Sequence, residues 1–124
     1  MTKKEASIKQ FQKAVKRLKD ALKQKKNEFI RDSAIQRFEF TFDLSWKVIK
    51  EFLEENHGVL CSSPKSCFRE AYKQGLLDYD DIWMKMTDKR NLTAHTYHEE
   101  TAEEIYSLLP GYLSGFEEIL KKIE

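Results

Sequence analysis

The stretch of residues 90–97 brings together side chains whose types and spacing suit chemistry on a phosphate ester. It holds a cation, an amide, an imidazole and a phenol: Arg90, Asn91, His95 and Tyr97. The planar guanidinium of Arg90 is permanently charged and can donate several hydrogen bonds to one phosphate. His95 can exchange a proton near neutral pH, and Tyr97 offers a hydroxyl that can be hydrogen-bonded or modified. A structural interpretation stays open, in which Arg90 and His95 are exposed cations near a helix end and Tyr97 packs at the next helix start.

Cleavage of an RNA phosphodiester without a metal ion requires little more than an Arg/His pair. A base removes the proton from the ribose 2′-hydroxyl, an acid protonates the leaving 5′-oxygen, and a cation stabilises the phosphorane. One His95 cannot be base and acid in the same step, but a two-fold dimer supplies two copies of each group. The sequence has no glycine-rich phosphate loop, no nucleophile elbow and no metal-ligand cluster, so we predict neither a cofactor nor a metal site.

The spacing of apolar residues predicts an all-α protein, an up-and-down bundle of four to five helices in one domain, residues 1–124. Charged residues make up 35% of the chain and hydrophobic residues 40%, with only 4 Gly and 2 Pro, which favours amphipathic helices over a turn-rich β fold. Gly58 is expected to end the second helix, and Ser63 with Pro64 to begin the third. The predicted helices cover residues 5–26, 32–57, 64–75, about 80–92, and about 97 onward, with Pro110 bending or breaking the last one.

The fourth helix is expected to end inside the 90–97 stretch. On a continuous helix, residues 90 and 95 would be about 140° apart and would not share a face. Thr96 followed three residues later by Glu99 matches a capping box, which predicts that a new helix starts at about residue 97. Arg90 would then lie in the last turn of one helix and His95 in the junction, where the two side chains can converge.

The second predicted helix is apolar on two faces. An aromatic stripe that includes Phe38, Phe42 and Trp46 is expected to pack in the core. A second strip on another face consists of Phe40, Leu44 and Val48. A helix that is apolar on more than one side must be covered on more than one side, so the second strip predicts a dimer interface.

The net charge of +1 is distributed unevenly along the chain. Residues 1–27 carry ten Lys or Arg and two acidic residues, whereas residues 98–124 carry two Lys and seven Glu. The basic end could meet RNA or an acidic partner. It could equally be the solvated face of a helix that packs beside the acidic one, and the sequence leaves both interpretations open.

Cysteine usage and hydropathy indicate a cytoplasmic protein. Two cysteines, Cys61 and Cys67, are too few for a disulfide-stabilised domain, and their spacing does not match a metal site. We therefore predict two reduced thiols. The N-terminus has no apolar segment typical of a signal peptide, and no apolar run approaches the ~18 residues of a membrane span. We therefore expect neither export nor membrane insertion.

The arginine, the histidine five positions later and the trailing tyrosine resemble the signature of HEPN domains (higher eukaryotes and prokaryotes nucleotide-binding). More closely, the chain resembles the bacterial family of nucleotidyltransferase substrate-binding proteins. The similarity covers most of the chain, through residues 38–47, 63–65, 68–71, 82–84 and 90–97. The spacing of Arg90 and His95 alone is a weak pattern, but Asn91, Tyr97 and the upstream segments make the resemblance specific.

The resemblance implies a HEPN-like bundle that forms a homodimer and works with a companion, a minimal nucleotidyltransferase. In one picture the chain is an RNase toxin: Arg90 would hold the scissile phosphate, and His95 would transfer protons. Asn91 would orient the site, and the companion would silence the toxin by adenylylating Tyr97. In the other picture the chain is a non-catalytic subunit that binds RNA, a nucleotide or another substrate for the companion. A third interpretation is a helical interaction module whose motif serves only the fold.

Overall fold

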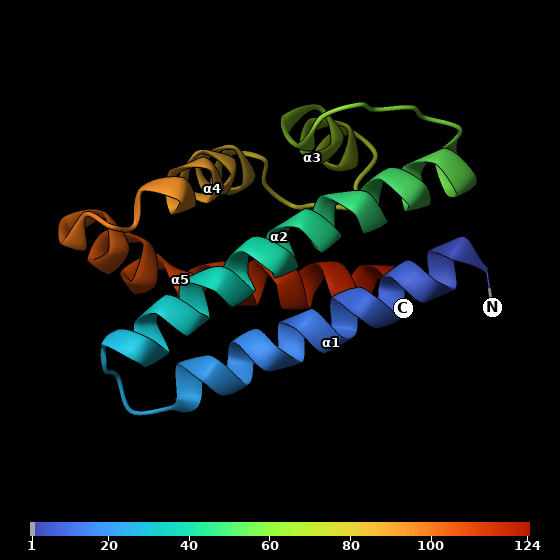
Figure 1. The fold of residues 1–124 in the computed structure, drawn as a ribbon. Coiled ribbons are helices and arrows are strands. Elements are labelled where there is room, and N and C mark those ends of the chain that lie inside the picture. The colour runs from blue at the N-terminus through green and yellow to red at the C-terminus, as the bar shows by residue number, and fades with distance from the viewer. Residues whose placement is uncertain (1) are drawn as a thin grey trace.

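The computed structural model describes residues 2–124, which form five α-helices and one short 3-10 helix and contain no β-strand. The elements are α1 (Lys3–Lys23), α2 (Glu28–His57), α3 (Pro64–Lys73), α4 (Asp81–Leu92), η1 (Thr93–His95) and α5 (Glu99–Ile123). The long helices α1, α2 and α5 pack on one another, and the short α3 and α4 lie across α2 from α1 (Figure 1). The predicted all-α helical bundle is confirmed.

Buried aromatic rings from all five helices form one continuous cluster at the centre of the bundle. The ring of Phe116 contacts those of Phe11 and Phe38 at centroid separations of 6.1 and 6.3 Å, and that of Trp83 at 5.8 Å. Phe68 in α3 stacks on Trp83 in α4 at 4.7 Å. Burial of each such ring stabilises the fold by about 1.5–3 kcal/mol. The cluster consists of Phe11, Phe38, Phe42, Phe68, Trp83, Tyr112 and Phe116. Of the aromatic stripe predicted on the second helix, Phe38 and Phe42 are in the core as expected, whereas Trp46 is half-buried.

Local capping chemistry sets several helix ends where the sequence places them. Gly58 ends α2 in the left-handed region, at φ 65°, and Ser63 caps α3 with Pro64 as its first residue. The start of α2 differs from the prediction, because Asn27 accepts a hydrogen bond from the N–H of Ile30 at 2.8 Å. This cap starts α2 at Glu28, four residues earlier than the apolar pattern indicates.

The predicted start of α5 is wrong, and the predicted alternative of a break at Pro110 does not occur. Thr96 does not cap this helix; its hydroxyl donates to the carbonyl of Thr93 at 3.3 Å, and α5 begins only at Glu99. The carboxylate of Glu99 is bound instead by Arg31, at 2.6 Å, so it does not complete a capping box. Pro110 lies inside α5, which is continuous through it, because the buried residues on either side hold the helix on the core despite one missing hydrogen bond.

The prediction of two reduced thiols is also wrong, because Cys61 and Cys67 form a disulfide. The segment after α2 folds back over the start of α3 and brings the two Cα atoms to 5.2 Å, within the span of such a bond. Reduced thiols were one of the observations behind the prediction of a cytoplasmic protein, and that support is withdrawn. No helix within residues 2–124 combines the length and apolar character needed to cross a bilayer.

Candidate functional site

The predicted site lies where α4, η1 and α5 meet. As expected, α4 ends inside the 90–97 stretch, at Leu92, and the 3-10 turn follows directly. Thr93 fixes this turn: it is buried, and its hydroxyl donates to the carbonyl of Arg90 at 2.7 Å. The same hydroxyl oxygen accepts from Nη1 of Arg90 at 3.3 Å. Backbone and side chain of Arg90 are therefore tied to one buried residue.

Arg90 extends from α4 to α2, where Asp43 binds it through two hydrogen bonds. The Nε–H donates to Oδ1 and Nη2 donates to Oδ2, each at 3.1 Å. Glu39, one turn earlier on α2, adds a carboxylate oxygen 3.9 Å from Nη1. The hydrogen bond with Asp43 raises the pKa of Arg90 above its ordinary value. Asp43 is not among the site residues that the sequence predicts; the available signal was its i, i+4 spacing from Glu39 on α2.

His95 and Tyr97 form a second pair, separate from Arg90. The Nδ1 atom of His95 lies 3.0 Å from the Tyr97 hydroxyl, and the Tyr97 ring packs on His98 with centroids 4.4 Å apart. Tyr97 is 72% exposed, and His95 and Asn91 are exposed as well. The predicted convergence of Arg90 and His95 does not occur as a direct contact: no hydrogen bond joins them within residues 2–124.

The hydrogen bond with Tyr97 determines which nitrogen of His95 is available for chemistry. If the phenol donates to Nδ1, the proton of a neutral imidazole is on Nε2, which is then only a hydrogen-bond donor. If Nδ1–H donates to the phenol oxygen, Nε2 presents a lone pair and is a base. In the imidazolium, Nδ1–H again donates to the phenol oxygen, and Nε2–H is an acid. A Tyr97 oxygen that accepts this hydrogen bond is therefore compatible with both roles of His95.

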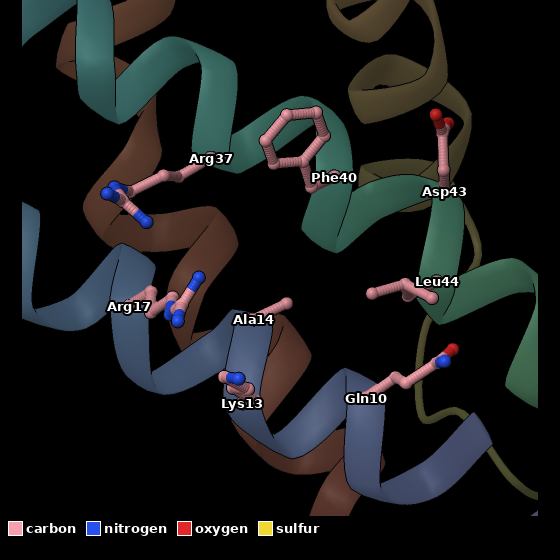
Figure 2. A pocket seen from close by; sticks show the side chains of 8 residues that line it. All are labelled: Gln10, Lys13, Ala14, Arg17, Arg37, Phe40, Asp43 and Leu44. Carbon is pink, nitrogen blue, oxygen red and sulfur yellow. The ribbon is translucent and has the colours of Figure 1, made fainter. Parts of the chain in front are cut away.

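A groove of about 460 Å³ runs between α1 and α2 beside this site. Figure 2 shows Arg17 on α1 and Arg37 on α2 along one part of it, and Phe40 with Leu44 farther along α2. Asp43, the partner of Arg90, also lines the groove. The residues that line it are Gln10, Lys13, Ala14, Arg17, Arg37, Phe40, Asp43 and Leu44.

The groove combines unpaired cations with exposed apolar surface. Within residues 2–124, neither Arg17 nor Arg37 has a carboxylate within salt-bridge distance. Other cations of the basic N-terminal part behave as the solvated-face interpretation expects, since Lys19 pairs with Glu117 of α5. Of the second apolar strip, Val48 is buried in the core, whereas Phe40 is 53% exposed and Leu44 is half-buried.

Arg31 anchors the first turn of α5 next to the His95–Tyr97 pair. Its side chain is 5% exposed, and it donates to Glu99 at 2.6 Å, to Asp32 at 3.0 Å and to Glu103 at 3.2 Å. The hydrogen bond with Arg31 lowers the pKa of Glu99, and hydrogen bonds with Lys26 and then Arg31 lower the pKa of Glu103. These ion pairs hold the start of α2 against the start of α5.

The sequence model of a protein family described as "Nucleotidyltransferase substrate binding protein like" matches residues 6–124. A crystal structure of a protein from Thermus thermophilus has a TM-score of 0.87 and 36% identity, over 92% of this chain and 99% of that one. A structure from Haemophilus influenzae, described as the fold of a substrate-binding domain of a nucleotidyltransferase, has a TM-score of 0.72 and 25% identity. That similarity covers 96% of this chain and 95% of the other.

One curated relative carries an activity in its name. A Haemophilus influenzae protein named "Probable ribonuclease HepT" is 34% identical to this chain over 84 residues. The alignment covers 64% of this chain and 58% of the relative, so it spans less than two thirds of the relative's length. The similarities to solved structures, in contrast, extend over nearly the whole chain.

Proposed function

We propose that this chain, which belongs to the nucleotidyltransferase substrate-binding protein family, is the HEPN-type subunit of a two-component system and cleaves RNA without a metal ion. One observation carries this proposal: a cation and a group that can transfer protons lie at the same helix junction, each oriented by a hydrogen-bond partner. Asp43 binds Arg90, and Tyr97 binds His95. The name of the 34% identical relative supports the same activity.

In this proposal Arg90 binds the scissile phosphate and stabilises the charge that develops on it. Nε2 of one His95 removes the proton of the ribose 2′-hydroxyl, whose oxygen attacks phosphorus. The bond from phosphorus to the 5′-oxygen breaks, and Nε2–H of a second His95 protonates that oxygen. The products are a 2′,3′-cyclic phosphate and a 5′-hydroxyl. Asn91, exposed on the last turn of α4, would orient the RNA.

The second His95 would come from a homodimer formed through the exposed face of α2. Phe40 leaves 53% of its surface to solvent, which is a large apolar exposure for a helix interior position. Glu39 and Asp43, which hold Arg90, flank Phe40 on this helix, so a two-fold contact along it would place two Arg90 sites at the interface. The unpaired Arg17 and Arg37 beside the interface would attract the RNA backbone.

The companion nucleotidyltransferase would silence the site at Tyr97, whose phenol is exposed to a second enzyme. The phenol oxygen attacks the α-phosphorus of ATP, its proton goes to a base, and the bond to pyrophosphate breaks. The attached nucleotide would occupy the space beside His95, two residues away, and block the approach of RNA to its imidazole. The added phosphate also repels RNA from the junction.

A second candidate is a non-catalytic subunit that binds the substrate of the companion enzyme. The Haemophilus influenzae structure with the same fold is described as a substrate-binding domain of a nucleotidyltransferase. The groove supports this alternative, since an exposed Phe40 beside Arg17 and Arg37 suits the base and phosphate of a nucleotide. A pure interaction module, the third candidate, predicts only a loss of stability on substitution of Arg90 or His95.

Expression in cells distinguishes these candidates. For a ribonuclease, the chain alone arrests growth, and Arg90→Ala, His95→Ala or coexpression of the companion relieves the arrest. Intact mass reports whether Tyr97 carries an adenylyl group, and thermal unfolding confirms that both variants remain folded. Unmodified wild-type protein that is as harmless as His95→Ala, while it copurifies with the companion, contradicts the ribonuclease and favours the binding subunit.

A further inference from the structure

We propose that Asp43 is a positioning residue, which presents the Arg90 guanidinium to an RNA phosphate in a fixed orientation; this role rests on the proposed ribonuclease function. Arg90 has five N–H donors, of which Asp43 takes the one on Nε and one on Nη2. Thr93 takes one on Nη1. Each terminal nitrogen keeps one N–H with no hydrogen-bond acceptor in residues 2–124, and two such groups match the two oxygens of a phosphate.

The contacts come from two separate elements and fix the guanidinium from different sides. Asp43 belongs to α2 and Thr93 to η1, so the side chain of Arg90 bridges the gap between them. Its side chain is 26% exposed, so part of it remains accessible to a ligand. A cation that is already oriented loses little freedom when the substrate arrives, which favours the transition state.

The carboxylate of Asp43 has a second effect of opposite sign. Its negative charge, together with that of Glu39, weakens the attraction of Arg90 for a phosphate. Removal of the Asp43 charge should therefore lower KM through reduced repulsion and lower kcat through lost orientation. A residue that only blocked the site would give a higher kcat on removal, and a residue that only stabilised the fold would lower the melting temperature and leave kcat unchanged.

The test compares cleavage of a short single-stranded RNA by unmodified wild type, Asp43→Ala, Asp43→Asn and a control. Asp20→Asn is the matched control: Asp20 is also 51% exposed and pairs with Lys16, away from Arg90. We expect kcat to fall about 10²-fold in Asp43→Ala, the size that a small misplacement of a catalytic group costs. The kcat of Asp43→Asn, which retains one acceptor oxygen, should fall less, and KM should be lower in both variants. A kcat of Asp43→Ala equal to or above that of wild type overturns the proposal.

A measurement without RNA separates failure of this inference from failure of the proposed function. The Nε–H signal of Arg90 in 15N NMR, assigned by its loss in Arg90→Lys, reports whether the guanidinium is held. We expect slow hydrogen exchange of this group in wild type and Asp20→Asn, and fast exchange in Asp43→Ala. Equal exchange rates in wild type and Asp43→Ala overturn the positioning role whatever the RNA assay gives. If the exchange is slow in wild type but wild type cuts no RNA, the proposed ribonuclease function fails and Asp43 has no effect on catalysis. The conclusion that Asp43 holds the Arg90 guanidinium still stands.

Discussion

Gly115 of α5 lies close to Trp83 of α4, and an added methyl group at this position tests how firmly α4 is placed. A Cβ on Gly115 would lie 3.2 Å from Cζ2 and 3.4 Å from Cη2 of Trp83. Trp83 cannot easily move away, because its ring is 4% exposed and stacks on Phe68 while it also contacts Phe116. Trp83 precedes Arg90 on the same helix, so this contact helps to place the cation of the candidate site.

Gly111, one turn earlier in α5, is the matched reference, because a Cβ there would have no atom within 4 Å. Gly111→Ala should raise the free energy of unfolding by about 0.5–1 kcal/mol, the usual gain of alanine over glycine in a helix. Gly115→Ala has the same gain, but overpacking against Trp83 costs about 1–3 kcal/mol. The helix propensity cancels between the two variants, so Gly115→Ala should be less stable than Gly111→Ala by about 1–3 kcal/mol.

Urea unfolding followed by circular dichroism measures this difference directly, with equal m-values as the condition for comparison. We expect the midpoint of Gly111→Ala above that of wild type, and the midpoint of Gly115→Ala at or below it. Equal stabilisation by both substitutions would refute the close contact between α4 and α5 and show that Trp83 has room to move.

Three further substitutions test other parts of the structure. Arg31→Gln should lower the free energy of unfolding near pH 7. The pKa values of Glu99 and Glu103 in the folded protein lie below 4.5, so both carboxylates become protonated as the pH falls below that value. The loss of stability caused by the substitution should therefore shrink there. Unfolding at several pH values checks this, and a constant loss would contradict the ion pairs. Phe40→Glu should give a folded monomer by light scattering, and a persistent dimer would exclude this face as the interface. Phe38→Ala should lower stability by about 3–5 kcal/mol in urea unfolding, and a loss near zero would contradict its place in the core.

The sequence was sufficient where local chemistry decides the structure. Apolar spacing located the helices, and the special backbone freedom of Gly58 and the fixed φ of Pro64 identified two of their ends. The end of α4 within residues 90–97 was likewise predicted, although the direct contact of Arg90 and His95 that motivated the prediction does not occur. These features depend on neighbours within one helical turn.

Features that depend on contacts between distant segments were not predictable from the pattern. Glu99 suits a capping box locally, but Arg31, 68 positions earlier, binds its carboxylate. Asp43 resembles an ordinary surface residue until α4 brings Arg90 against it, 47 positions later in the chain. The continuity of α5 through Pro110 has the same origin, since tertiary packing outweighs the lost hydrogen bond.

RNA cleavage by the purified chain, measured without the companion and beside His95→Ala, is the decisive test of the proposed ribonuclease. Intact mass must first show that Tyr97 is unmodified, and scattering that the protein is dimeric. We expect cleavage by wild type, products that end in a cyclic phosphate, and no cleavage by a folded His95→Ala dimer. Intact RNA after incubation with unmodified, dimeric wild type, or equal cleavage by both proteins, would contradict the proposal.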